Sequence, residues 1–311
     1  MLSRTFRSMA SEVELRVLDP YPHAAASLER AEKAVREVAR HCTRFDPTSA
    51  LSRANAAPDS WHLVPDVLAD AVLEAERAHR ETEGRFDPRI LDTLLAWGYD
   101  RSLPFADGDV TTDGMPDPAP LDEPWQPAVR PRRRPALHLG GRAIDLGGIG
   151  KGLAVRRAAA ELAGVGGSWL VDAGGDEYLG GPGPTGSGWR VGVEDPLGGA
   201  DPVLVLAVRD AGCATSSTRL RRWTASGAAV HHLIDPRSGR PGGDGLAAVT
   251  VVGPDTAWAE VWSKALFLAG ADAIGTEADD RGLAASWVTT GGRIATSEAM
   301  DPLVIWRRDR D

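Results

Sequence analysis

The stretch Ala143-Ile144-Asp145-Leu146-Gly147-Gly148-Ile149-Gly150-Lys151-Gly152 joins a short apolar approach, one acid, four glycines and one lysine. An amphipathic run over 153–162 follows it and predicts a helix. Glycine has no Cβ, so the backbone of such a loop can come close to a ligand. A helix that begins there directs unpaired N–H groups and the positive end of its dipole at whatever binds. Lys151 adds a positive charge, and the stretch therefore predicts a phosphate or pyrophosphate site.

Short apolar or alternating runs on both sides of this loop predict a β-rich second half of the chain. They are bounded by Gly, Pro, Asn and Asp, which favour turns. One run at helical spacing, 256–268, predicts a helix among them. The expected strands cover 136–139, 143–146, 169–172, 189–194, 203–208, 228–234, 247–252, 284–289, 293–296 and 303–306.

The first third of the chain reads as one strand followed by helices. Residues 13–18 alternate between aliphatic and charged side chains, which predicts a strand. Apolar positions recur at helical spacing over 25–41 and 65–82, and a shorter helix is expected over 90–97. Together these elements predict an α+β fold with an antiparallel β-sheet core and packed helices.

The same pattern predicts one domain over residues 9–306, since no internal repeat divides the chain. Residues 100–135 are rich in Pro, Asp and Gly and show no sustained period. We therefore expect a loop insertion over 100–135.

Composition limits the classes of partner. The chain has 311 residues with 35 basic and 44 acidic side chains, and this acidic balance without a long basic tract argues against nucleic acid or anionic lipid. Two cysteines, Cys42 and Cys213, form neither a disulfide framework nor a zinc motif. No apolar stretch has the length to span a bilayer, and none follows the basic N-terminus. We expect a cytoplasmic protein without membrane insertion.

Three further segments group residue types that a core would not select: 42–52, 84–88 and 231–241. Taken singly, each has a structural interpretation. Asp-Pro pairs begin turns, and the adjacent His231 and His232 would point to opposite faces of a strand.

The order of these segments along the chain resembles the ApbE family of FAD:protein FMN transferases. The Phe-Asp-Pro segments, the glycine loop, Asp172-Ala173-Gly174-Gly175-Asp176, Thr215-Ser216 and the segment 232–241 follow in one sequence. The resemblance implies transfer of FMN from FAD to a Thr or Ser hydroxyl of a target flavoprotein, with release of AMP. It also implies a T-fold-like α+β unit that takes FAD as substrate and magnesium at the pyrophosphate.

Carried over by position, the resemblance implies particular roles for single residues. By its chemistry rather than by carry-over, His232 is the candidate general base, because the ordinary pKa of an imidazole lies near neutrality. The alternative is a histidine that is satisfied within the sheet. Ala10 and Ser11 follow Met9 where the family has Gly-Thr, a departure in a flavin-contacting strand. The implied FAD contacts are Met9, Phe45, Arg85, Phe86, Asp87, Asp145, Lys151 and Ile234.

The implied metal site departs from the family pattern. Its ligands would be the Gly148 carbonyl, Glu260 and Ser263, but Lys264 stands where the family has a threonine ligand. An ammonium has no lone pair to offer a cation. Glu260 and Lys264 are spaced for a helical ion pair. Alternatively, Lys264 contacts the pyrophosphate, or Glu260, Gly148 and Ser263 hold a displaced magnesium.

Other functions stay open at this point. The same pocket would serve an FAD pyrophosphatase, in which water attacks instead of a protein hydroxyl. A non-catalytic FAD-binding protein is the alternative outside enzymes, and Lys264 is the feature that favours it. A dinucleotide-binding Rossmann domain is disfavoured, because the glycine spacing at 147–152 and the surrounding elements do not match that motif.

Overall fold

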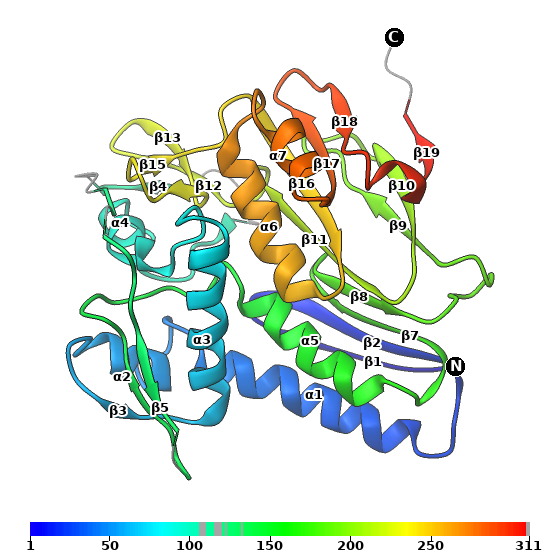
Figure 1. The fold of residues 1–311 in the computed structure, drawn as a ribbon, viewed down its shortest axis with the longest axis horizontal. Coiled ribbons are helices and arrows are strands. Elements are labelled where there is room, and N and C mark those ends of the chain that lie inside the picture. The colour runs from blue at the N-terminus through cyan, green and yellow to red at the C-terminus, as the bar shows by residue number, and fades with distance from the viewer. Residues whose placement is uncertain (106–109, 115–119, 122, 132, 309–311) are drawn as a thin grey trace. The chain divides into compact units, whose positions relative to one another are not determined.

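The computed structural model describes residues 1–105, 110–114, 120–121, 123–131 and 133–308. The chain forms two compact units, each assembled from separate stretches of sequence (Figure 1). Unit 1 comprises residues 1–39, 151–217 and 244–311, and unit 2 comprises residues 40–150 and 218–243.

An antiparallel sheet of eight strands forms the centre of unit 1. Its strand order is β1-β2-β7-β8-β11-β16-β17-β18, and every neighbouring pair is antiparallel. The strands span Leu2–Ser8, Ser11–Pro20, Gly166–Ala173, Glu177–Gly180, Ala211–Ser217, Leu246–Gly253, Ala284–Thr289 and Ile294–Thr296.

One face of this sheet lies against helices. In β2, Val13, Leu15 and Val17 are fully buried while the residues between them are not, as the period of a strand requires. Helix α1 (Ala24–His41) lies along β1, where the Arg36 guanidinium sits 4.7 Å from the centre of the Phe6 ring.

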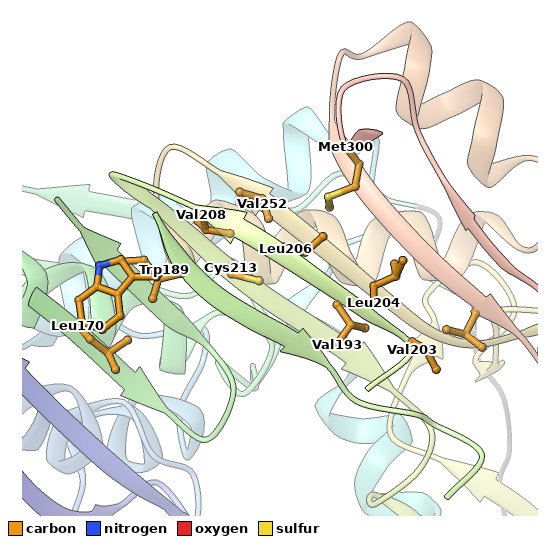
Figure 2. Close-up of a cluster of buried hydrophobic side chains, with 12 residues drawn as sticks. Leu170, Trp189, Val193, Val203, Leu204, Leu206, Val208, Cys213, Val252 and Met300 are labelled. Carbon is orange, nitrogen blue, oxygen red and sulfur yellow. The ribbon is translucent and has the colours of Figure 1, made fainter. Parts of the chain in front are cut away.

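The opposite face packs on a second, three-stranded sheet of unit 1. Strands β9 (Trp189–Val193), β10 (Leu204–Val208) and β19 (Val304–Arg307) form that sheet, and a short 3₁₀ turn, Asp301–Leu303, precedes β19. Side chains from both sheets interdigitate in one buried apolar cluster (Figure 2). Its members include Leu170, Leu179, Trp189, Val193, Leu204, Leu206, Val208, Cys213, Val252 and Met300.

Helix α6 (Thr256–Ala269) covers the centre of the eight-stranded sheet and begins at a conventional cap. The Asp255 side chain accepts hydrogen bonds from the Ala257 and Trp258 amides. Helix α5 (Gly150–Leu162) crosses it so closely that a Cβ at Gly152 would lie 2.5 Å from the Cα of Ala257. Gly152 is therefore required for helix packing. Helix α7 (Ile274–Asp280) follows α6.

The described residues of unit 2 form helices and three small sheets. The sheets are β3-β6-β5, β13-β12-β4 and the pair β14-β15. The helices are α2 (Ala50–Asn55), α3 (Asp66–Glu81), the 3₁₀ turn Pro88–Ile90 and α4 (Leu91–Ala96). The strands are β3 (His62–Leu63), β4 (Thr111–Thr112), β5 (Ala128–Arg130), β6 (Ala136–His138), β12 (Arg222–Ala225), β13 (Ala228–His231), β14 (Ile234–Asp235) and β15 (Arg240–Pro241).

The structure confirms the α+β class and most of the expected elements. The helices expected over 25–41, 65–82, 90–97, 153–162 and 256–268 all form within a few residues of those bounds. The strand expected over 143–146 is wrong, because these residues form no strand, and the one expected over 228–234 is interrupted between β13 and β14.

The domain prediction, 9–306 with an insertion at 100–135, stays a prediction. Within 100–135 the structure describes the two short strands β4 and β5, and residues 106–109, 115–119, 122 and 132 lie outside the described part. Among the described helices, none combines the length and the apolar character that crossing a bilayer requires.

Candidate functional site

The acid of the glycine loop is fixed by several contacts within unit 2. Asp145 Oδ1 accepts a 2.5 Å hydrogen bond from the Gly147 amide, and Oδ2 accepts a 2.6 Å bond from Nε of Arg44. The Asp145 amide donates to the Pro88 carbonyl at 2.7 Å. The loop thus presents an acid whose orientation is set before any ligand arrives.

Arg44 is buried among aromatic rings. Its guanidinium lies 4.1 Å from the centre of the Phe45 ring and 4.7 Å from that of Tyr99. The side chain is only 4 % exposed, and Nη2 is buried without a hydrogen-bond partner among the described residues. Burial raises the pKa of the Tyr99 hydroxyl. Phe45, the predicted flavin or adenine contact, is 44 % exposed beside these groups.

The predicted contact segment Arg85-Phe86-Asp87 is largely occupied by protein contacts. Asp87 is buried, caps the 3₁₀ turn that follows it through the Arg89 amide, and pairs with the Arg89 guanidinium at 2.6 Å. Phe86 is buried, and Arg85 is half-buried. In this chain Asp87 therefore has a clear role in shaping unit 2, and its contact with FAD stays a prediction.

The segment after β13 places the two histidines differently. His231 ends β13, and burial lowers the pKa of its imidazole to about 4. His232 lies in the turn that follows, where Nδ1 is 3.3 Å from the Arg221 carbonyl oxygen. Ile234 begins β14 and packs its side chain into an apolar cluster with Trp97 and Trp223. A backbone contact from Ile234 to FAD stays a prediction.

A second set of charges lies in unit 1, around the first turn of α5. Nζ of Lys151 pairs with the buried Asp176 at 2.5 Å. Asp172 accepts a hydrogen bond from the Gly175 amide, and burial raises its pKa. Burial, with the charges of Asp172 and Asp176, raises the pKa of Glu177 to about 8. Glu177 is therefore protonated at neutral pH.

The predicted contact Met9 lies in the turn between β1 and β2. Met9 and Ala10 both have left-handed backbones, with φ of 50° and 59°. Glycine is the residue that adopts this conformation without strain, and the resemblance implies a glycine at the position of Ala10. The next residue, Ser11, lies so close to Gly174 that a Cβ there would meet its Oγ at 2.6 Å.

The donors of the predicted magnesium site fit that ion poorly. Glu260 is buried, its Oε2 accepts the Gly152 amide at 2.8 Å, and its Oε1 lies 3.3 Å from Nζ of Lys264. The Ser263 hydroxyl donates to the Glu260 carbonyl at 2.9 Å and lies 2.7 Å from Oγ of Ser216. Magnesium takes oxygen ligands in near-octahedral geometry, and an ammonium supplies none.

Elsewhere the described residues contain no group of three or more His, Cys, Asp or Glu arranged to hold a metal. Gly148 belongs to unit 2, whereas Glu260 and Ser263 belong to unit 1. The assignment of these three as ligands stays a prediction, and the hydrogen bonds that Glu260 and Ser263 already make weigh against it.

Sequence reasoning did not predict two pairings of the loop, that of Arg44 with Asp145 and that of Asp176 with Lys151. Arg44 is a charged residue directly before an aromatic one, a pattern too common to single out. Asp176 is explained equally well as a turn residue. Only the fold shows that they pair with Asp145 and Lys151.

The sequence also matches a family described as the ApbE family, over residues 9–287. The chain belongs to the ApbE family. Among relatives, it is 30% identical to an FAD:protein FMN transferase of Treponema pallidum over 247 residues. That match covers 71% of this chain and 65% of the relative.

Other ApbE proteins extend the comparison. The Escherichia coli K12 FAD:protein FMN transferase is 27% identical over 262 residues, covering 80% of this chain and 72% of that protein. The crystal structure of the ApbE protein of Thermotoga maritima superposes with a TM-score of 0.77 at 23% identity, covering 99% of both chains. The flavin transferase ApbE of Vibrio cholerae gives a TM-score of 0.76 at 20% identity, covering 97% of this chain and 98% of that one. These structures confirm the ApbE fold.

Proposed function

We propose that this ApbE chain is an FAD:protein FMN transferase. A Thr or Ser hydroxyl of a target flavoprotein attacks the phosphorus of the FMN half of FAD. A new P–O bond forms to that hydroxyl oxygen, and the bond from the same phosphorus to the bridging oxygen breaks. AMP leaves with the bridging oxygen, and the hydroxyl proton passes to a base. The activity named for the relatives supports this reaction.

The observation that carries the proposal is the start of α5. The helix begins at Gly150, directly after the glycine loop, and Lys151 lies in its first turn. The helix N-terminus and the ammonium both favour an anion such as a pyrophosphate. Phosphoryl transfer depends mainly on such positioning and charge stabilisation. The pair Lys151–Asp176 holds the ammonium in one place and offsets part of its charge.

His232 is our proposed general base. If Nδ1 donates its proton to the Arg221 carbonyl, Nε2 is the basic nitrogen of the ring. The base takes the hydroxyl proton as the P–O bond forms, a contribution of typically about 10² to 10⁴ in rate. Its neighbour His231 is unsuited to the task at neutral pH, because a pKa of about 4 leaves it a weak base.

The remaining contacts form part of the same proposal. The exposed Phe45 ring beside Tyr99 offers an aromatic surface to a flavin or adenine ring. Met9, Arg85, Phe86, Asp87, Asp145 and Ile234 are the other proposed FAD contacts. No step is assigned to magnesium, since the donors at Glu260 and Ser263 fit it poorly. A cytoplasmic location completes the proposal, and fractionation of cells that express the tagged chain tests it.

A transfer assay tests the function. The purified chain is mixed with FAD and a peptide that bears the acceptor threonine, and the products are identified by mass spectrometry. A peptide heavier by FMN, with one AMP released per transfer, is the expected result. AMP and free FMN with an unmodified peptide would identify a pyrophosphatase. Retention of FAD without any cleavage would identify a non-catalytic binding protein.

A further inference from the structure

The ion pair between Glu260 and Lys264 occupies the place where the family arrangement implies a divalent cation. Both residues lie on α6, one turn apart. Glu260 Oε2 holds the Gly152 amide, one residue after Lys151 in the first turn of α5. Lys264 is thus linked through one carboxylate to the turn that we propose binds the pyrophosphate.

The Lys264 ammonium has more N–H donors than the hydrogen bonds it makes among the described residues. An ammonium carries three N–H groups. Among the described residues, Nζ of Lys264 makes two hydrogen bonds, at 3.3 Å to Glu260 Oε1 and 3.4 Å to the Glu260 carbonyl. Both are longer than a good charge-assisted hydrogen bond, which measures about 2.7–2.9 Å. The side chain is 16 % exposed, so it is mostly desolvated yet weakly paired.

Lysine is rare in this chain, which makes its presence here informative. Of the 35 basic residues, only Lys33, Lys151 and Lys264 are lysines. All three belong to unit 1, and two of them lie around Gly152, one beside the buried Asp176 and one beside the buried Glu260. Arginine presents a planar fork, whereas lysine presents a compact point charge on a flexible stem. A compact, mobile charge is what a replacement for a small cation requires.

The charges of these residues also balance without a metal. Lys151 and Lys264 each face one buried carboxylate, Asp176 and Glu260. A magnesium ion bound to Glu260 would meet the Lys264 ammonium directly, since no other described acid pairs with that lysine. Like charges at such short range repel strongly in a desolvated site.

We propose that the Lys264 ammonium takes the place of the divalent cation at the FAD pyrophosphate, with Glu260 as its positioning residue. The proposal rests on the proposed function for its substrate. When FAD arrives, Lys264 donates to a phosphate oxygen with the N–H groups that Glu260 leaves available. No covalent bond changes at this step.

The test measures FAD affinity and metal binding as well as turnover. FAD is titrated into the metal-stripped full chain by calorimetry, in EDTA and in excess Mg²⁺, and Mn²⁺ binding to the chain with FAD is followed by its electron paramagnetic resonance spectrum. We expect dissociation constants that agree within about threefold in the two buffers, and no stoichiometric Mn²⁺ binding. Loss of FAD binding in EDTA with recovery in Mg²⁺, or one tightly bound Mn²⁺ per chain, overturns the proposal.

Variants sharpen the result. Lys264→Thr should weaken FAD binding in EDTA by more than about tenfold, and Mg²⁺ should restore part of it. Lys33→Thr, the matched control on the exposed side of α1, should leave both dissociation constants unchanged. An unchanged affinity of the folded Lys264→Thr chain in EDTA would contradict the proposal. If that variant fails to fold, the wild-type titration and the Mn²⁺ spectrum still decide.

The assay also separates this inference from the proposed function. A chain that binds FAD equally in EDTA and Mg²⁺, but releases no AMP with any acceptor, would refute the transferase and leave the role of Lys264 supported. AMP release that requires Mg²⁺ would refute the role of Lys264 and leave the transferase intact.

Discussion

Arg44 and Asp145 form a buried ion pair of 2.6 Å between residues that are 101 positions apart in the sequence. The pair joins the segment before α2 to the glycine loop within unit 2. Since Asp145 also accepts the Gly147 amide, Arg44 orients the loop from a distance in sequence. Arg44 is therefore a structural determinant of the proposed FAD site.

The first prediction concerns this pair. Arg44→Ala leaves a buried carboxylate without its cation, so we expect a loss of about 3–5 kcal/mol in the free energy of unfolding. Urea denaturation followed by tryptophan fluorescence measures it. Arg101→Ala removes an exposed pair with Asp100 and should change stability by less than about 0.5 kcal/mol. Equal effects of the two substitutions would contradict the importance given to Arg44.

The second prediction concerns pH. The pKa of Glu177 is raised to about 8, so the folded chain binds a proton that the unfolded chain releases near the ordinary value for Glu. The contribution of protonated Glu177 to the free energy of unfolding is fully present at low pH. It is lost as pH rises from about 4.5 to about 8, with a slope of up to about 1.4 kcal/mol per pH unit.

Glu177→Gln should remove that part of the slope, as measured by denaturation at several pH values. Comparison with the wild type isolates Glu177 from other groups that titrate. Glu29→Gln, an exposed substitution on α1, is the control and should leave the slope unchanged. A slope that survives Glu177→Gln would show that another group is responsible.

The third prediction separates catalysis from binding. His232→Ala should lower kcat by about 10² to 10⁴ and change the dissociation constant of FAD by less than about threefold. His231→Gln alters a histidine that is already neutral at the assay pH, so it should not change the shape of the pH–rate profile. Comparable losses of turnover and FAD affinity in His232→Ala would remove its role as the base.

The fourth prediction uses two glycines of the loop as a matched pair. At Gly152 a Cβ would lie 2.5 Å from the Cα of Ala257, and at Gly150 it would meet nothing within 4 Å. Gly152→Ala should destabilise the chain by about 1–3 kcal/mol, because α5 must move from α6.

Gly150→Ala should keep the stability within about 0.5 kcal/mol and yet weaken FAD binding, if the ligand approaches the backbone there. Thermal unfolding and FAD titration of both variants measure these effects. An unchanged FAD affinity in Gly150→Ala would show that the ligand does not approach the backbone at Gly150.

The fifth prediction concerns backbone strain at the β1–β2 turn. Ala10 has a φ of 59°, a left-handed conformation that costs a non-glycine residue about 1–2 kcal/mol. Ala10→Gly should stabilise the chain by about 0.5–1 kcal/mol, because relief of strain exceeds the extra entropy of the unfolded chain. Ala34→Gly, in the middle of α1, should instead cost about 1 kcal/mol. A loss of stability in Ala10→Gly would show that the turn is not strained.

Much of the fold could be predicted from periodicity, since each long helix buries one apolar face. Periodicity gives the wrong result for residues 143–146, where a strand is expected and none forms. Ile144 and Leu146 are buried as a strand pattern predicts. However, the Asn55 side chain makes two hydrogen bonds to the backbone of Ile144, and the Pro88 carbonyl accepts the Asp145 amide. Side chains and loops distant in sequence satisfy this backbone in place of a neighbouring strand.

The candidate site could be predicted only in part, because some of its contacts are local in sequence and others depend on the tertiary fold. The loop and its lysine are local in sequence, so Asp145 and Lys151 were recognisable by pattern. Arg44, Asp176 and the Gly152 contact of Glu260 depend on the tertiary fold. The family resemblance also implies Glu260 and Ser263 as ligands, but it does not show that their oxygens are already hydrogen-bonded.

The pairing of β2 with β7 affects how the chain is synthesised. Leu15 of β2 lies opposite Val171 of β7. The β1–β2 hairpin is therefore synthesised 156 residues before the strand that pairs with the free edge of β2. At about 5–20 residues per second, this corresponds to a delay of roughly 8–30 s. Throughout that time the unpaired edge of β2 is available for aggregation or for a chaperone. We therefore expect the yield of folded chain to depend on translation speed and chaperone supply, and no N-terminal fragment that stops before β16 to retain the complete sheet.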